Sequence, residues 1–186
     1  MDDLGPPARR ADAERNRSKI LVSARSAFAD PDARVSMAEV ARRAGVGMAT
    51  LYRNFPSRRE LLEALYADEV DAICRAAATA RGETTDAVLH AWLRRFFAFA
   101  TSKRHIASEL LEHTDTSNPV FGDSRARVLE AGRPLLRAAQ RSGEMRKDLT
   151  LEQVLDLLVA IAGIRDNARY LKPILRVALD GLRPPA

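Results

Sequence analysis

The chain has 186 residues, of which 46% are hydrophobic and 30% are charged, which predicts one or two small folded domains rather than a disordered chain. No apolar run approaches the roughly 20 residues that a membrane-spanning helix needs, and residues 1–17 lack the apolar segment of a secretory signal. A single cysteine, Cys74, excludes an internal disulfide and a cysteine-rich zinc module, and these absences together lead us to expect a cytoplasmic protein.

The net charge of +5 is concentrated near the N-terminus. Residues 1–60 carry 12 Lys and Arg against 8 Asp and Glu, whereas residues 61–186 carry 18 against 17. A basic N-terminal third is typical of proteins that bind a polyanion such as nucleic acid. A solvated, arginine-rich surface would have the same composition, so the charge alone leaves both interpretations open.

The first helix is expected between about residues 12 and 29, behind a segment, residues 1–10, that we expect to be a disordered basic tail. Ile20, Ala24 and Phe28 recur at helical spacing and give this helix an apolar face. The sequence ADPDA follows and combines proline with aspartates, which predicts the end of the helix.

A second helix is predicted to begin at Ser36, because Ser36 and Glu39 have the spacing of a capping box. Gly45 supplies the left-handed backbone with which many helices end. A third helix follows at once and must end by Phe55, because the proline after it disfavours helical backbone in the preceding residue.

The rest of the chain also has helical periodicity, and no strand pattern or internal repeat interrupts it. Ser57 with Glu60 and Thr150 with Gln153 form further capping boxes, and Asn118 before a proline marks another helix start. We therefore predict an all-α protein of about nine helices. The later helices are expected at about 57–80, 84–101, 103–113, 118–141, 151–164 and 166–181.

Two short helices joined by AGVG, with a third helix before them, are the pattern of a helix-turn-helix. The second helix of such a unit must enter a DNA major groove while its other side packs on its neighbours. Projected at 100° per residue, Leu51 and Phe55 lie on the packed side together with Gly47, and Tyr52 and Arg53 point the other way. Among the remaining positions, Ala49 also points outward, Thr50 flanks it, and Met48 and Asn54 lie on the borders.

The outward side chains have chemistry that suits DNA. Arg53 can bond to guanine O6 and N7 in a bidentate way, and Thr50 can reach a phosphate or a base edge. The Tyr52 hydroxyl can reach a phosphate. The free N–H groups at the helix starts can donate hydrogen bonds to phosphates as well. The arginines that add cations are Arg9, Arg10, Arg15, Arg17, Arg42, Arg43 and Arg58.

Residues 36–66, SMAEVARRAGVGMATLYRNFPSRRELLEALY, closely resemble the DNA-binding segment of TetR-family transcriptional regulators. The resemblance implies an all-α homodimer with a DNA-binding domain at 11–56 and a ligand-binding and dimerisation domain at 57–186. It also implies contact roles for Thr50 and Tyr52, a specificity role for Arg53 and Asn54, and a phosphate contact for Arg58. Residues predicted to contact DNA are Ser36, Arg42, Arg43, Gly47, Met48, Ala49, Thr50, Tyr52, Arg53, Asn54 and Arg58.

Gly47 departs from the family pattern, which often has serine or another polar residue there. This substitution removes a side-chain contact at the start of the third helix and leaves more weight on the backbone N–H. The closing sequence ALDGLRP also resembles the end of some actinobacterial members.

The resemblance further implies an effector pocket and a dimer interface in the C-terminal domain. The residues expected to line the pocket are Tyr66, Cys74, Trp92, Phe96 and Phe99. The residues expected in a four-helix interface across a twofold axis are Leu155, Leu158, Ile161, Leu171, Ile174, Leu175 and Ala178. Core packing is the alternative role for any one of these apolar residues.

No cofactor, metal site or enzyme activity is predicted, because no phosphate-binding glycine loop, nucleophile elbow or carboxylate pair occurs. Glu109 and His113 lie four residues apart, but two ligands do not make a metal site. Cys74 is interpreted as a small buried side chain rather than a redox sensor.

The resemblance therefore implies a transcriptional repressor that binds an inverted-repeat operator as a homodimer and is released by a small-molecule effector. The alternative is an architectural or partner-recruiting DNA-binding protein without ligand control. A fully packed C-terminal half would favour this alternative, and an apolar cavity would favour the repressor.

Overall fold

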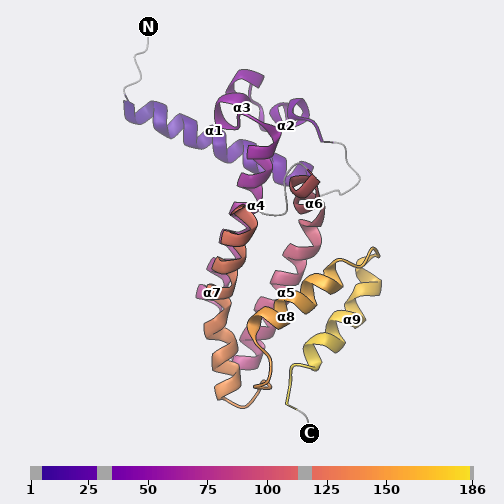
Figure 1. Ribbon diagram of the computed structural model, residues 1–186. Coiled ribbons are helices and arrows are strands. Elements are labelled where there is room, and N and C mark those ends of the chain that lie inside the picture. The colour runs from indigo at the N-terminus through magenta and orange to yellow at the C-terminus, as the bar shows by residue number, and fades with distance from the viewer. Residues whose placement is uncertain (1–5, 29–34, 113–118, 185–186) are drawn as a thin grey trace. The chain divides into compact units, whose positions relative to one another are not determined.

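The computed structural model describes residues 6–28, 35–112 and 119–184, and within these ranges all regular structure is α-helical (Figure 1). This confirms the predicted all-α class. The helices are α1 (Pro6–Ala27), α2 (Met37–Ala44), α3 (Met48–Asn54), α4 (Arg58–Thr79), α5 (Thr85–Ser102), α6 (Arg104–Glu112), α7 (Pro119–Arg141), α8 (Leu151–Ala162) and α9 (Ala168–Asp180).

The first helix begins at Pro6, earlier than the sequence pattern suggested. Proline is tolerated in the first turn of a helix, because the N–H groups there have no partner within the helix. The alanines and arginines that follow are good helix formers. Of the tail expected to be disordered, residues 6–10 are therefore helical, and residues 1–5 lie outside the described part of the chain.

The chain divides into two compact units, Met1–Tyr66 and Ala67–Ala186. The boundary falls within α4, later than the expected division after residue 56. The first turn of α4 belongs with the N-terminal unit because Arg58 donates a hydrogen bond to the Val35 carbonyl. The guanidinium carbon of Arg58 also lies 5.0 Å from the centroid of the Phe28 ring.

In the N-terminal unit, α1, α2 and α3 pack against one another. Their contact is made by fully buried side chains, among them Ile20 and Ala24 from α1, Val40 from α2 and Leu51 from α3. Helices of eight and seven residues are too short to persist alone in water. The burial of this shared core is therefore what holds α2 and α3 in place.

In the C-terminal unit, α5 packs against α7 and α8, and α8 packs against α9. Trp92 of α5 is buried, and its Nε1 donates a hydrogen bond to the Ile73 carbonyl at 3.2 Å. Gly132 of α7 allows this close packing, because a Cβ at that position would lie 2.2 Å from Cη2 of Trp92. The same Cβ would lie 2.9 Å from Cδ2 of Leu151.

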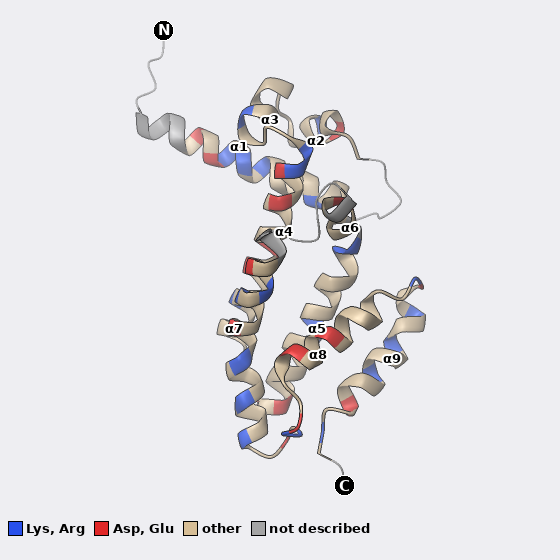
Figure 2. Cartoon of the chain, viewed as in Figure 1, with Lys and Arg blue, Asp and Glu red and all other residues tan. Residues whose placement is uncertain are grey.

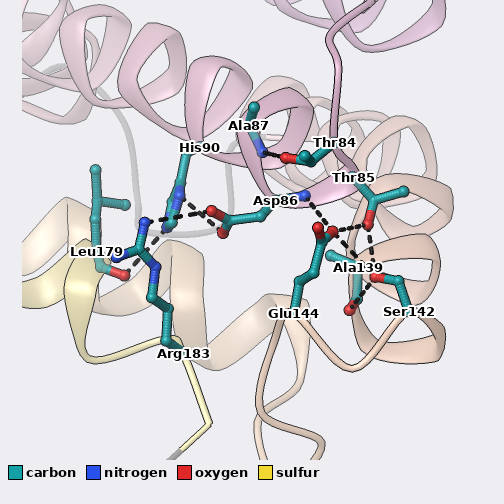
Figure 3. A network of polar contacts seen from close by, with 10 residues as sticks. All are labelled: Thr84, Thr85, Asp86, Ala87, His90, Ala139, Ser142, Glu144, Leu179 and Arg183. Atoms are coloured by element: carbon teal, nitrogen blue, oxygen red, sulfur yellow. Dashed lines mark hydrogen bonds and ion pairs between the residues drawn. The ribbon is translucent and has the colours of Figure 1, made fainter.

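The start of α5 is held by a network of polar contacts (Figure 3). Glu144, in the segment between α7 and α8, accepts hydrogen bonds from the Asp86 N–H at 3.0 Å and from the Thr85 hydroxyl. These bonds lower the pKa of Glu144. The helix dipole also favours a carboxylate at a helix N-terminus, so both the hydrogen bonds and the dipole stabilise Glu144 in this position.

The same network reaches α9 through His90, which is buried (Figure 3). Nε2 of His90 lies 3.1 Å from the Leu179 carbonyl, so that nitrogen must carry the hydrogen. Nδ1 of His90 lies 2.9 Å from Oδ1 of Asp86. The geometry of this contact is not that of a hydrogen bond, and Oδ1 of Asp86 has no other hydrogen-bond partner among the described residues. Arg183 approaches the other Asp86 oxygen at 3.4 Å and thereby ties the chain beyond α9 to α5.

The capping box predicted at Thr150 and Gln153 is confirmed. The Gln153 N–H donates to the Thr150 hydroxyl at 3.3 Å, and the Thr150 N–H donates to Oε1 of Gln153 at 2.9 Å. At Ser57 the hydroxyl accepts from the Glu60 N–H at 3.1 Å and donates to the Glu60 carboxylate. Asn118 lies outside the described residues.

None of the helices in the described ranges combines the length and the apolar character that a membrane span needs.

Candidate nucleic-acid interface

α2 and α3 form a helix-turn-helix whose turn is set by Gly45. This residue has the left-handed conformation, with φ at 65°, and its N–H bonds to the Arg42 carbonyl at 3.3 Å. The Val46 N–H bonds to the Ala41 carbonyl at 3.1 Å. The predicted end of α2 at Gly45 is thus confirmed, and the turn leads the chain directly into α3.

α3 has one buried side and one exposed side. Leu51 is fully buried, and Phe55, which directly follows the helix, is buried as well. Tyr52 is 45% exposed and Met48 is 40% exposed, high values for large apolar or aromatic side chains. The exposed side chains of α3 are Met48, Ala49, Tyr52 and Arg53. They form the surface that the sequence pattern assigned to DNA.

Thr50 and Asn54 lie beside this surface and are half-buried. Nη2 of Arg53 donates to the Thr50 hydroxyl oxygen at 3.0 Å, which orients the guanidinium along the outer side of the helix. Nδ2 of Asn54 donates to the Thr50 carbonyl at 2.8 Å. Because its amide is engaged with the helix, Asn54 is less available for a base than Arg53.

Gly47 is the N-cap of α3, and it has no side chain to cap the first N–H groups. It is exposed, although the helical projection placed it on the packed side. Its φ of −72° is suitable for any residue, and a Cβ there would meet nothing within 4 Å. The backbone therefore does not require glycine at this position.

Arg42 and Arg43 at the end of α2 are exposed, and both contact Glu39. Oε1 and Oε2 of Glu39 accept from Arg42 at 2.8 and 2.9 Å, and Nε of Arg43 donates to Oε1 at 2.6 Å. These hydrogen bonds, from Arg42 first, lower the pKa of Glu39 to about 2. One carboxylate thus offsets part of the positive charge that the two arginines bring to the surface.

The capping box predicted at Ser36 forms only in part. The Ser36 hydroxyl accepts from the Glu39 N–H at 3.2 Å, as expected. The Glu39 carboxylate, however, bonds to Arg42 and Arg43, because they lie three and four residues later on the same face of the helix. Ser36 itself is exposed. The i,i+3 and i,i+4 spacing of Glu39 with Arg42 and Arg43 is the sequence signal for these ion pairs.

Two further arginines make contacts within the N-terminal unit. Arg58, predicted to meet a phosphate, is half-buried against Phe28 and the Val35 carbonyl. Arg17 of α1 donates to the Asn54 carbonyl and lies over the Phe55 ring. The sequence spacing carries no signal for contacts between residues so far apart in the chain.

The remaining arginines of α1 that were predicted to add cations are Arg9, Arg10 and Arg15. Arg15 pairs with Asp12 one turn earlier on α1. The side chains of Arg9 and Arg10 lie outside the described part of the structure. Figure 2 shows further Lys and Arg positions on α1 and on α3, in the unit where the sequence has most of its excess positive charge.

Three of the residues predicted to line a pocket form one aromatic row on α5. The ring centroids of Trp92 and Phe96 are 6.3 Å apart, and those of Phe96 and Phe99 are 6.1 Å apart. All three are buried. Cys74 is half-buried, and burial raises the pKa of its thiol, which does not favour a redox sensor. Tyr66 belongs to the N-terminal unit, and burial raises its pKa.

The residues predicted for a dimer interface divide into two groups. The buried ones are Leu155, Leu158, Ile161 and Leu171, and the half-buried ones are Ile174, Leu175 and Ala178. The large apolar residues that are exposed on the two helices and next to them are Leu157, Val159, Ile164, Tyr170 and Val177. α8 is apolar on almost every side, so its periodicity could not distinguish the inner face from the outer one.

No group of three potential metal ligands occurs among the described residues. Of the pair considered from the sequence, Glu109 is half-buried, and His113 lies outside the described residues.

A helix-turn-helix whose second helix exposes Tyr52 and Arg53, followed by a separate helical unit, defines a class of proteins that bind duplex DNA. The family described as bacterial regulatory proteins, tetR family, matches residues 20–65. The SbtR-like transcriptional regulator C-terminal domain matches residues 84–184. The chain therefore belongs to the TetR family of transcriptional regulators, which are DNA-binding proteins and not enzymes.

Solved structures agree with this assignment. The chain is 36% identical to a TetR transcriptional regulator from Streptomyces coelicolor, over 91% of this chain and 99% of that one, with a TM-score of 0.75. A TetR regulatory protein from Mycobacterium vanbaalenii is 33% identical over 94% and 99%, with a TM-score of 0.74. RolR, solved with resorcinol, is 19% identical over 93% and 90% with a TM-score of 0.59, and shares the fold. No curated protein sequence matches the chain.

Proposed function

We propose that this protein is a repressor that binds an inverted-repeat operator as a homodimer and is released by a small-molecule effector. The observation that carries the proposal is the exposed surface of α3, where Tyr52 and Arg53 are open to solvent while Leu51 is fully buried. A helix held in this way can enter a major groove without losing its contacts to the unit.

The roles proposed for the side chains follow from their exposure and chemistry. Arg53 reads a guanine through two parallel hydrogen bonds, and its contact with the Thr50 hydroxyl oxygen holds it near the required orientation. Tyr52 and Thr50 bond to phosphates or base edges. Met48 and Ala49 present apolar groups that a thymine methyl can contact.

For the dimer, we propose the exposed apolar residues as the contact surface, because most of the large residues first predicted are already buried within one chain. Leu157 is exposed on α8, and Ile164 is exposed just beyond the end of that helix. Tyr170 and Val177 are seven residues apart and share one side of α9. Val177 is 71% exposed. A second copy of the chain is the proposed occupant, because a twofold dimer presents two α3 helices to two half-sites of a palindrome.

For the effector, we propose a site in the C-terminal unit beside the aromatic row of Trp92, Phe96 and Phe99, with Cys74 at its margin. Buried aromatic side chains supply large apolar contact area to a ligand. RolR, which shares the fold, was solved with resorcinol. A small phenol is therefore one reasonable first probe for this chain.

The test begins with selection of DNA sequences by the protein from a random pool. An inverted repeat is expected, with half-site centres about one helical turn or somewhat more apart. Selection of a single, unrepeated site would contradict the dimer. Enrichment of no sequence would contradict a base-reading role for α3.

The proposed release by an effector is tested with the protein bound to the selected duplex. Trp92 is the one tryptophan in the sequence and lies in the proposed site, so its fluorescence should change when a ligand binds. The same compound should release the duplex in a gel shift. If compounds bind beside Trp92 without releasing DNA, or none binds, the architectural or partner-recruiting alternative is favoured.

A further inference from the structure

The end of α3 needs support from outside the helix. α3 has only seven residues, and the last carbonyls of any helix lack partners within it. The Leu51 carbonyl accepts from the Phe55 N–H at 2.8 Å, and the Thr50 carbonyl accepts from Nδ2 of Asn54. The Asn54 carbonyl lies at the very end of the helix, next to Arg53, and is left to a partner from elsewhere in the unit.

Arg17 of α1 supplies that partner. Its Nη1 donates to the Asn54 carbonyl at 3.2 Å, and its guanidinium carbon lies 4.4 Å from the centroid of the Phe55 ring. A guanidinium can do both at once, because its donors lie in the plane and its flat face stacks on an aromatic ring. Its positive charge is also favourable at the C-terminal end of a helix.

The start of the helix-turn-helix has a parallel arrangement. Arg58 of α4 lies over the ring of Phe28 and donates to the Val35 carbonyl, one residue before the N-cap of α2. The segment between residues 35 and 55 is therefore held at both ends. In each case an arginine from a flanking helix lies over a buried phenylalanine ring and bonds to a backbone carbonyl.

We propose that Arg17 is a positioning residue for sequence recognition. It fixes the end of α3 and so the direction in which Arg53 and Tyr52 face the groove, and it does not act by neutralising a phosphate. The inference rests on the proposed role of α3 as the base-reading helix. It assigns to a residue of α1 an effect on specificity that its distance in the sequence from α3 would not suggest.

The competing role is that of a simple cation near the DNA backbone, as the charge pattern first suggested. The two roles differ in salt dependence. The logarithm of the binding constant falls with the logarithm of the salt concentration, and loss of one phosphate contact makes this fall less steep by about 0.9. Substitution of a positioning residue leaves the steepness unchanged. They differ also in what lysine can replace, because lysine keeps the charge but lacks the flat, forked guanidinium.

The test compares Arg17→Met, Arg17→Lys and Lys19→Met, measured by fluorescence anisotropy on a selected operator duplex and a scrambled one at several salt concentrations. Lys19 is an exposed cation two residues further along α1 and is the control for loss of charge. Arg17→Met should lose roughly tenfold in operator affinity, with little change on the scrambled duplex and an unchanged salt slope. Arg17→Lys should show the same reduced discrimination between operator and scrambled duplex as Arg17→Met. Lys19→Met should discriminate between the two duplexes as well as the wild-type protein does.

Hydrogen exchange on the free protein supplies a second measurement. The amides of residues 51–55 should exchange faster in both Arg17 variants than in the wild-type protein or in Lys19→Met. If Arg17→Met does not fold, Arg17→Lys gives the same comparison, because it retains the charge and most of the side chain.

Several outcomes would overturn the proposal. The first is that Arg17→Lys discriminates between the operator and the scrambled duplex as well as the wild-type protein does. The second is a salt slope that is smaller by about one unit, with an equal loss of affinity on both duplexes. The third is unchanged hydrogen exchange of the amides of residues 51–55. Arg53→Ala separates these from a failure of the proposed function. If Arg53→Ala abolishes discrimination and the Arg17 variants do not, α3 reads bases and only the positioning role is wrong.

Discussion

Several arginines of the two units are used differently, although Arg104 of the C-terminal unit also donates to backbone carbonyls, those of Ala162, Gly163 and Ile164. In the N-terminal unit, Arg42 and Arg43 share one carboxylate on their own helix, and Arg17 and Arg58 bond to backbone carbonyls. In the C-terminal unit, arginines of α7 pair with acids on other helices. These pairs are Arg125 with Asp156, Arg127 with Asp71, and Arg133 with Glu152.

This difference reflects the charge balance of the sequence. The last 126 residues hold nearly equal numbers of basic and acidic side chains, so arginines there find carboxylates on neighbouring helices. The hydrogen bond from Arg133, for example, lowers the pKa of Glu152 to about 2. The first 60 residues have an excess of cations, so several cations must bond to carbonyls or remain available to an anionic partner. Exposed ion pairs contribute little stability, so their placement says more about partners than about folding.

The largest expected effect concerns the inner and outer sides of α8. Leu158 is 1% exposed and Leu157 is 44% exposed. Leu158→Glu should lose at least about 3 kcal/mol of unfolding free energy, because it buries an unpaired carboxylate in place of an apolar side chain. Leu157→Glu should remain folded but dissociate into monomers. Denaturant titration and light scattering measure the two effects, and a dimeric Leu157→Glu would move the interface away from this side of α8.

A second effect tests the packing of the C-terminal unit. Gly132→Ala should lower the unfolding free energy by about 1–3 kcal/mol, because the new methyl group overlaps the Trp92 ring. Gly122 on the same helix is the matched control, since a Cβ there meets nothing within 4 Å. Gly122→Ala should gain about 0.5–1 kcal/mol from reduced backbone freedom. Equal effects of the two changes would mean that the α5–α7 contact is looser than described.

A third effect tests the exposed surface of α3 in the N-terminal unit. Arg53→Ala should cost about 1–3 kcal/mol in operator binding and relax the preference at one base pair. Tyr52→Phe should weaken binding to all sequences alike, because a phosphate contact carries no sequence information. Anisotropy titrations with operator and scrambled duplexes distinguish the two. A uniform loss for Arg53→Ala would contradict its base-reading role.

The smallest expected effect is at the N-cap of α3. Gly47→Ser should raise the unfolding free energy by a few tenths of a kcal/mol, because a serine hydroxyl can cap the first N–H groups and the backbone is already compatible. Thermal unfolding measures the gain. A lower unfolding free energy for Gly47→Ser would contradict the open space that surrounds a Cβ at this position. The same variant should shift base preference in a new selection, because the added hydroxyl lies beside Met48.

Much of the proposed DNA-binding surface could be predicted from the sequence. The exposure of Ala49, Tyr52 and Arg53 and the burial of Leu51 and Phe55 follow from a local period of 3.6 residues. Gly45 and Thr150 were predicted as helix boundaries because caps act within a few residues. Helix ends elsewhere were placed to within a few residues for the same reason, apart from the early start at Pro6.

The C-terminal unit was less predictable where apolar residues surround a helix. In α8 the sequence offers large apolar side chains on both sides, and the choice of Leu158 over Leu157 for the core is made by α5, α7 and α9. The network around His90 likewise joins residues 86–90 to residues 142–144 and 179–183. No local pattern indicates such contacts, because they depend on how separate helices meet.

The sequence by itself determined the helical class, the helix-turn-helix and the residues that α3 exposes, since each depends on neighbours within one or two turns. Only the tertiary structure decided which arginines are engaged with distant parts of the protein. Arg17 and Arg53 are both exposed, yet Arg17 lies over the buried Phe55 ring and bonds to a carbonyl of another helix, whereas Arg53 bonds within α3. The physical reason is that burial and hydrogen bonding to a distant carbonyl are properties of the packed unit, whereas periodicity is a property of the chain.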